Sequence, residues 1–269
     1  MELFDSHAHY DDEKFNEDRD ELIMKIYNSG IKKIVSAGYS LESSKKSIEL
    51  SGKYEFIYST CGISPNDIPY VNSEVPYKEQ DILKEFYKQL QEIEELAKFE
   101  KVVAIGEIGL DYHWHTDNKE IQKQVFIDQI KLANKLNLPI VIHTRDAVMD
   151  TLDILKNKIK TVKPGIFHCC PLNVELVREA IKLGFYISFA GPVTFKNSKN
   201  AQEVVNMVPL DKILIETDSP YLSPEPKRGQ RNDSRNVKYI LDKISEIKGI
   251  EVNELAEIIY NNTINALDI

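Results

Sequence analysis

The chain has 269 residues, and its 43 acidic against 34 basic side chains give a formal net charge of −9. This charge argues against a broad electropositive surface that would hold duplex DNA, although cations bound among carboxylates would reverse the local sign and leave a nucleic-acid substrate open. Membrane-span and signal-peptide patterns are absent, and the 3 cysteines lack CxxC spacing, so we expect a cytoplasmic protein without a disulfide framework.

Short apolar runs, most of them rich in β-branched or aromatic residues, predict strands along the whole chain. The eight runs are Leu3–His9, Ile31–Gly38, Phe56–Ile63, Val102–Gly109, Pro139–His143, Gly165–Cys169, Phe185–Phe189 and Ile213–Thr217. Most lack polar alternation, as is typical of strands buried on both faces. Helical patterns separate them, with apolar stripes over residues 121–136, 154–159, 174–181 and 255–259.

Alternating strands and helices of this number predict an α/β fold, a (β/α)₈ TIM barrel, and we expect one domain over residues 1–269. The alternative is a doubly wound open sheet, which would need a glycine-rich phosphate loop after the first strand. The sequence there is His-Ala-His-Tyr. The polar stretch Asn66–Tyr87 predicts a long loop that leads into a helix.

Residues able to bind a metal recur at the predicted strand ends. They are His7 and His9 in the first strand, then Glu107, His143, His168 and Asp218 at the ends of the fourth, fifth, sixth and eighth. Residues two apart in a strand point to the same side, so the first two imidazoles converge. In a barrel all carboxyl ends of strands meet at one face. Six such side chains suffice for two divalent ions with a bridging carboxylate and a bound water.

Each of these residues has a structural alternative when taken alone. Glu107 could pair with a neighbouring basic side chain, and His143 and His168 could be hydrogen-bonded core histidines. Asp218, before Ser-Pro, could form a turn or a helix cap. Their joint placement at one face of a barrel favours the metal site.

Several motifs resemble those of the TatD family of metal-dependent hydrolases, in the amidohydrolase-like TIM-barrel superfamily. They are DSHAH (Asp5–His9), GEIGLDY (Gly106–Tyr112), NLPIVIHTRDA (Asn137–Ala147), FHC (Phe167–Cys169), ETDSPYL (Glu216–Leu222) and the pair Arg231-Asn232. The resemblance implies that His7, His9 and Asp218 bind one metal. It implies that His143 and His168 bind a second, with Glu107 as the bridge.

The same resemblance implies a deoxyribonuclease of the 3′→5′ exonuclease type. We predict that it acts on single-stranded or frayed DNA ends, because a narrow site at a barrel mouth suits an end better than the interior of a duplex. Two divalent ions (Mg²⁺, Mn²⁺ or Zn²⁺) would activate a bridging water, with Asp218 and Glu107 as the catalytic carboxylates. Alternatives are hydrolysis of another ester or amide, such as aminoacyl-tRNA deacylation or hydrolysis of a small phosphoester, and a catalytically silent barrel that serves as a metal-dependent binding module. Retention of the six ligand types argues against the silent barrel.

Three residues are candidates for substrate contacts. Arg145 is a candidate phosphate clamp, with a rim salt bridge to Asp146 as the alternative. His113 belongs to a second HxH with His115 and is assigned mainly to the substrate rim or an exposed loop. Arg231 belongs to a basic cluster with Lys227, Arg228 and Arg235 that could guide a phosphate chain or be a solvated loop. Trp114, the single tryptophan, could stack on a base or pack on the rim.

Three loops depart from the family pattern. Ser64 and Asn66 stand where many members carry histidines, which puts a substrate contact from that loop in doubt. Cys169-Cys170-Pro171 follows His168 in place of an aromatic, Ser and Gly. Asp233-Ser234 follows the Arg-Asn pair, so only the acidic character survives there.

Overall fold

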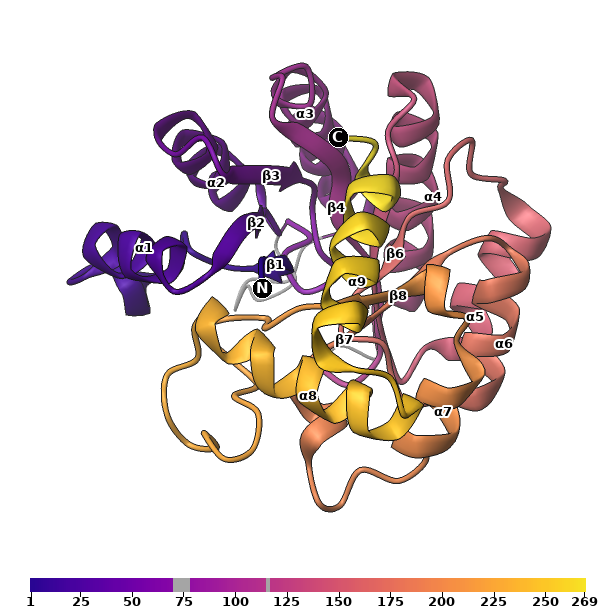
Figure 1. The fold of residues 1–269 in the computed structure, drawn as a ribbon. Helices are drawn as coiled ribbons and strands as arrows, with labels where there is room; N and C mark the ends of the chain where they lie inside the picture. The colour runs from indigo at the N-terminus through magenta and orange to yellow at the C-terminus, as the bar shows by residue number, and fades with distance from the viewer. Residues whose placement is uncertain (70–77, 115–116) are drawn as a thin grey trace.

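The computed structural model describes residues 1–69, 78–114 and 117–269, and its centre is one sheet of eight parallel strands in sequential order (Figure 1). The strands are β1 (Leu3–Ala8), β2 (Ile31–Ala37), β3 (Ile57–Cys61), β4 (Val102–Asp111), β5 (Ile140–Arg145), β6 (Ile166–Phe167), β7 (Tyr186–Phe189) and β8 (Ile213–Ile215). A bridge between Ala8 and Ser219 nearly closes the sheet into a barrel. The predicted TIM-barrel fold is confirmed.

Helices alternate with the strands around the barrel. They are α1 (Arg19–Asn28), α2 (Leu41–Lys53), α3 (Glu79–Leu96), α4 (Lys119–Leu136), α5 (Val148–Asp153), α6 (Val174–Lys182), α7 (Ala201–Met207), α8 (Val237–Lys248) and α9 (Val252–Leu267). Short 3₁₀ turns occur at Glu13–Phe15, Gly191–Thr194, Leu210–Lys212 and Ser234–Asn236, and a π-helical turn at Ile154–Lys158 follows α5. Among the residues described, no helix combines the length and apolar character needed to cross a bilayer.

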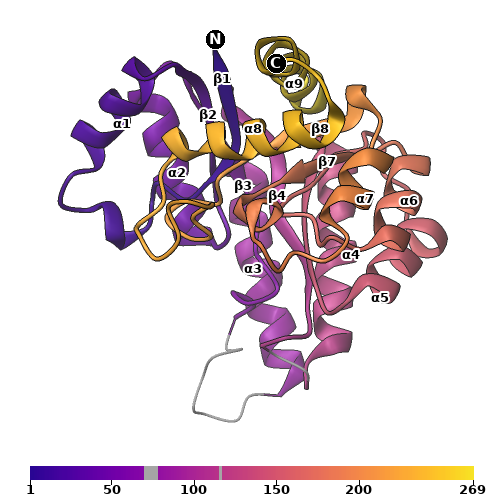
Figure 2. The ribbon, with the colours of Figure 1, turned by 60° about the horizontal axis from the view of Figure 1, so that its bottom comes forward.

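Two apolar clusters hold the barrel together. The larger packs the helices against the outer faces of the strands, with residues such as Phe126 and Ile240 fully buried. The smaller joins Phe4, Val141 and Leu214, from three strands, to Leu267 near the end of α9. Helix α9 contacts β1 and β8, and Figure 2 shows it at the same end of the molecule as the N-terminus. That end is therefore covered, and the carboxyl ends of the strands lie at the opposite one.

Two strands are longer than the sequence pattern predicts. Strand β4 continues to Asp111 and pairs with β5 through Gly109–His143 and Asp111–Arg145, so Glu107 and His143 lie inside strands rather than at their ends. Gly109 permits this close pairing, since a Cβ there would lie 1.9 Å from the His143 carbonyl oxygen at a φ of +145°. Strand β6 is shorter than predicted, and His168 follows it directly.

Some predicted boundaries also change. The helical pattern expected around residues 154–159 begins earlier, at Val148, and ends in the π-helical turn. Within the predicted loop Asn66–Tyr87, α3 already begins at Glu79. Residues 70–77 of that loop, and His115 of the second HxH, lie outside the described residues.

Candidate metal centre

The six side chains that the sequence singled out as metal ligands come together at the carboxyl ends of the strands. His7 lies on β1, Glu107 on β4 and His143 on β5, while His9, His168 and Asp218 lie just after β1, β6 and β8. His7, His9, Glu107 and His168 are buried. Their nitrogen and oxygen atoms form two groups of donors.

The first donor set consists of His7, His9, one oxygen of Glu107 and Asp218. His7 Nε2 lies 3.2 Å from His9 Nε2 and 3.4 Å from Glu107 Oε2. Asp218 Oδ1 lies 3.2 Å from His9 Nε2 and 3.7 Å from His7 Nε2. Four potential ligand atoms from three distant parts of the chain thus surround one point.

The second donor set uses the other oxygen of the same glutamate. Glu107 Oε1 lies 3.1 Å from His143 Nδ1 and 3.3 Å from His168 Nε2. The two ring nitrogens are 3.2 Å apart. Glu107 is therefore the one side chain that contributes an oxygen to each set.

The spacing of these atoms fits a metal ion. Ligand atoms about 2.1 Å from a tetrahedral Zn²⁺ lie about 3.4 Å from one another. Donor separations are 3.2–3.8 Å in the first set and 3.1–3.3 Å in the second. Imidazole nitrogens with carboxylate oxygens are donors that Zn²⁺ and Mn²⁺ accept. The residues present therefore fit divalent ions in both sets.

Three of the histidines are oriented through their second nitrogen. His9 Nδ1 donates to the Ala37 carbonyl at 3.0 Å, which leaves Nε2 facing the first donor set. His143 is reversed, because its Nε2 lies 3.0 Å from Asp111 Oδ2 and its Nδ1 faces the second set. His168 Nδ1 lies 3.5 Å from Glu216 Oε1. Contacts of this kind fix the tautomer and the direction of metal-binding histidines.

Without a metal the centre holds its charge as ion pairs. Burial lowers the pKa of His9, but the hydrogen bond and charge of Asp218 outweigh it and raise that pKa to about 9. Burial would raise the pKa of Asp218, but His9 brings it down to about 2. Glu107 is likewise held well below its usual pKa by His168 and His143, despite its burial. Protons on histidines thus balance the carboxylates.

His7 behaves differently from its neighbours. Its ring stacks on that of His168, with centroids 4.1 Å apart and an interplanar angle of 15°. Burial and the nearby charge of His168 both lower its pKa. His7 is therefore neutral in the metal-free protein, the form in which an imidazole binds a metal.

Two carboxylates in the centre were missed by the sequence analysis as functional residues. Asp111, at the end of β4, accepts a hydrogen bond from His143. Burial would raise the pKa of Asp111, but the hydrogen bonds from His143 and Asn66 outweigh it and lower that pKa. Glu216, directly after β8, is fully buried beside His168. Both lie within motifs already noted, GEIGLDY and ETDSPYL. Their role became visible only through neighbours that are distant in the sequence.

The predicted substrate residues lie outside the two donor sets. Arg145 ends β5, and its guanidinium lies over the exposed ring of Trp114 at 5.4 Å. Asp146 pairs with His113 at 3.2 Å. Arg231 forms two hydrogen bonds with Asp18. An exposed group beside β4 and β5 is thus formed by Arg145, Trp114, Asp146 and His113. Arg231 instead joins the loop after β8 to the start of α1.

The loop after β3 contacts the second donor set indirectly. Ser64 donates to Asp67, and Asn66 Nδ2 donates to Asp111 at 3.1 Å.

Asn232 of the Arg-Asn pair is buried and donates to the carbonyls of Thr217 and Tyr221. Asn232 therefore stabilises the backbone segment that carries Asp218.

Comparison with known proteins identifies relatives over nearly the whole chain. The sequence model of the family described as TatD related DNase matches residues 4–268. The uncharacterized metal-dependent hydrolase YabD of Bacillus subtilis is 43% identical over 260 residues, covering 97% of this chain and 96% of that protein. The uncharacterized metal-dependent hydrolase YcfH of Escherichia coli K12 is 36% identical over 265 residues, with 97% and 94% covered.

A solved structure has the same fold. The crystal structure of YJJV, a TatD homolog from Escherichia coli K12, superposes with a TM-score of 0.87 over 99% of this chain and 98% of that one. Its sequence identity is 24%, so the likeness concerns the barrel rather than its substrate. Fold and family relatives agree with the donor sets in indicating a metal-dependent hydrolase.

Proposed function

The chain belongs to the TatD-related DNase family of metal-dependent hydrolases, and from this premise we propose that it is a two-metal phosphodiesterase. Its substrate is DNA, which it shortens from 3′ ends that are single-stranded or frayed. The observation that carries this proposal is the placement of Glu107, whose two carboxylate oxygens face two separate groups of ring nitrogens. A carboxylate in that position is suited to hold two ions side by side.

The charges of the centre support two divalent ions rather than one. Four carboxylates contact its histidines, namely Glu107, Asp218, Asp111 and Glu216. When ionised, these four carboxylates carry a combined negative charge that balances the positive charge of two divalent cations. His7, His9 and Asp218 would hold one ion, His143 and His168 the other, and Glu107 would contact both.

Ions held there would act as Lewis acids that activate a water and stabilise charge on phosphoryl oxygens. The chain's own residues supply the rest. The carboxylate of Asp218 lies 3.2 Å from His9 Nε2 at the edge of the first donor set, where it would be placed to take a proton from an attacking water. Asp111 fixes His143, and the Ala37 carbonyl fixes His9, so the donor groups need little rearrangement.

The exposed group beside β4 and β5 supports a single-stranded substrate. Trp114 is 64% exposed, an unusual state for a tryptophan, and Arg145 lies against its ring. Base stacking on an aromatic ring contributes about 1–3 kcal/mol per base, and the guanidinium is suited to a phosphate. Arg145 lies two residues after His143 on β5, and residues two apart in a strand point to the same side. His113 would support the tryptophan from its edge.

The remaining candidate for substrate contact is Arg231. Its positive charge is balanced by the carboxylate of Asp18, with which it forms a salt bridge at 2.6 Å. Arg235 is paired likewise with Asp233. We therefore assign Arg231 a weaker contribution to substrate binding, through the charge of the wider cluster that it forms with Lys227 and Arg228.

A nuclease assay with purified protein tests the proposal. Single-stranded and blunt duplex oligonucleotides with a label at either end are incubated with Mg²⁺, Mn²⁺ or Zn²⁺, and Glu107→Gln serves as the size-matched control. We expect stepwise shortening of the single strand from its 3′ end, lost in the variant. Equal cleavage by both proteins would refute the assigned centre. Turnover of an aminoacyl-tRNA or a small ester without DNA cleavage would instead establish the second candidate activity.

A further inference from the structure

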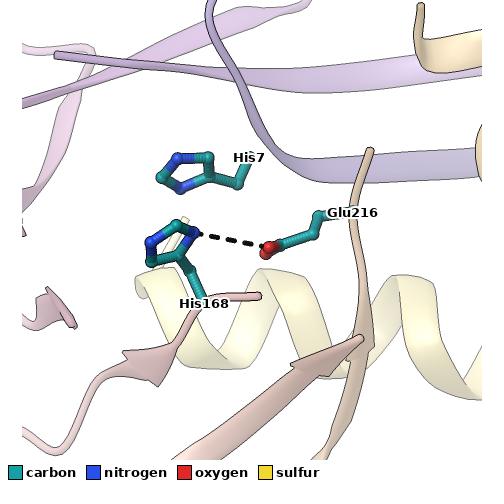
Figure 3. A group of neighbouring side chains, drawn as sticks. All are labelled: His7, His168 and Glu216. Carbon is teal, nitrogen blue, oxygen red and sulfur yellow. Dashed lines mark ion pairs between the residues drawn. The ribbon is translucent and has the colours of Figure 1, made fainter. Parts of the chain in front are cut away.

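A carboxylate that no donor set uses lies beneath the centre. Glu216 follows β8 and has an exposed fraction of 0%. Figure 3 shows it beside His168, with the ring of His7 above that of His168. One nitrogen of each histidine and one oxygen of Glu216 all lie within 4.8 Å of one another. A charge enclosed to this degree needs partners, because burial without them is costly.

The partners of Glu216 are incomplete in the described part of the chain. Its Oε1 accepts a hydrogen bond from the backbone N–H of Cys169 and lies 3.5 Å from His168 Nδ1. Its Oε2 has no hydrogen-bond partner there, and neither have the Nδ1 atoms of His7 and His168. Two buried ring nitrogens and a buried carboxylate oxygen are thus left without a partner, on three side chains that each place one polar atom within 4.8 Å of the other two.

The arrangement of the rings explains why these atoms belong together. His7 and His168 are stacked nearly parallel, and each directs Nε2 toward a different oxygen of Glu107. A neutral imidazole whose Nε2 binds a metal carries its proton on Nδ1. Both Nδ1–H groups then need an acceptor, because a buried donor left without one destabilises the folded state.

We propose that Glu216 is a positioning residue shared by the two metal sites, which accepts the Nδ1–H of both His7 and His168. It fixes both rings as Nε2 ligands, one for each ion. It thus links the two donor sets on the Nδ1 side of the rings, as Glu107 links them on the Nε2 side. This inference rests on the proposed two-metal centre. It adds a residue that touches neither ion nor substrate.

The backbone after His168 supports this role. Cys169 adopts a φ of 37°, which is unfavourable for a residue with a side chain. In this conformation its N–H points to Glu216 Oε1. Residues held in such conformations cluster where the structure needs a particular geometry. The bond fixes one carboxylate oxygen and leaves lone pairs for the two rings.

Zn²⁺ titration of the metal-free protein tests the proposal, because metal binding is measured apart from DNA cleavage. Glu216→Gln keeps the size of the side chain but replaces one acceptor by a donor. Asp111→Asn is the matched control, since Asp111 contacts only His143 among the histidines of the centre. Removing such supporting contacts typically weakens metal affinity about 10–100-fold. We expect Glu216→Gln to weaken both binding events by this factor and Asp111→Asn to weaken one.

A second measurement needs no variant. In the Zn²⁺-loaded wild type, ¹⁵N NMR of the imidazoles should show protonated Nδ1 and metal-bound Nε2 for both His7 and His168. Metal binding through Nδ1 of either ring would overturn the proposal. So would undiminished affinity in Glu216→Gln, weakening of a single event, or a third Zn²⁺ that this variant loses, which would make Glu216 a ligand. Failure to cleave DNA with both affinities behaving as expected would refute the proposed substrate alone.

Discussion

The metal-free protein should lose stability as the pH rises from 7 to 9.5, because the centre then depends on protonated histidines. His9 is the clearest case. It lies between Asp218 and Glu107, at 3.2 and 3.8 Å, and its pKa is raised to about 9 from 6.5. A group whose pKa is higher in the folded state stabilises the fold fully below its unfolded pKa. That contribution disappears as the pH passes the folded pKa.

The expected size follows from these two values. With pKa values of about 9 folded and 6.5 unfolded, protonation of His9 contributes about 2.6 kcal/mol at pH 7 and about 0.2 kcal/mol at pH 9.5. His143 and His168 also have raised pKa values and act in the same direction. Asp5, with a pKa of about 7, is half ionised at the start of this range, and its remaining ionisation also lowers stability as the pH rises. The free energy of unfolding should therefore fall by at least about 2 kcal/mol.

Urea unfolding of chelator-treated protein, followed by circular dichroism at pH 7, 8, 9 and 9.5, measures this loss. The fall in His9→Gln should be smaller by about 2 kcal/mol, because the titrating group is gone. Protein loaded with Zn²⁺ should show a much weaker dependence, since metal replaces the protons. A stability that is flat or rises over this range in the metal-free wild type would refute the reasoning. An unchanged slope in His9→Gln would do so too.

Three further outcomes follow from the structure. Gly109→Ala should lower the free energy of unfolding by more than about 3 kcal/mol, since its Cβ would lie 1.9 Å from the His143 carbonyl oxygen; a urea midpoint near that of the wild type would contradict this. Asn232→Ala should cost about 1–3 kcal/mol, because the Thr217 carbonyl beside Asp218 loses a buried donor, and it should also weaken Zn²⁺ binding. A chelator should lower the melting temperature reversibly, since ions that bind only the folded chain stabilise it; calorimetry with and without re-added Zn²⁺ measures this.

The fold follows from the sequence because most of the strands are buried on both faces. Runs such as Ile213–Thr217 are apolar without alternation and alternate with helical stripes, which is a strong local signal. The exact bounds are a different matter. The register of Gly109 opposite His143 extends β4 by two residues beyond the predicted run, and that register depends on a neighbouring strand rather than on local composition.

The six candidate ligands could be predicted because each is a polar residue in an otherwise apolar run, and the barrel brings such positions to one face. Their support could not be predicted in the same way. Asp111 and Glu216 are also polar residues at strand ends, but their function lies in facing the second nitrogen of a histidine on another strand. Which nitrogen of His143 faces the glutamate, and which faces Asp111, depends on ring orientation that sequence spacing does not contain.

The loop after β3 supports the second donor set through a chain of hydrogen bonds from Asn66 to His143. Asn66, which stands where many family members carry a histidine, donates to Asp111, and Asp111 accepts from His143. The substitution therefore acts on the second donor set through two hydrogen bonds. An amide in this position supplies a donor at every pH, whereas a histidine would add a titrating charge beside Asp111. The loop then serves to hold Asp111 ionised and His143 oriented.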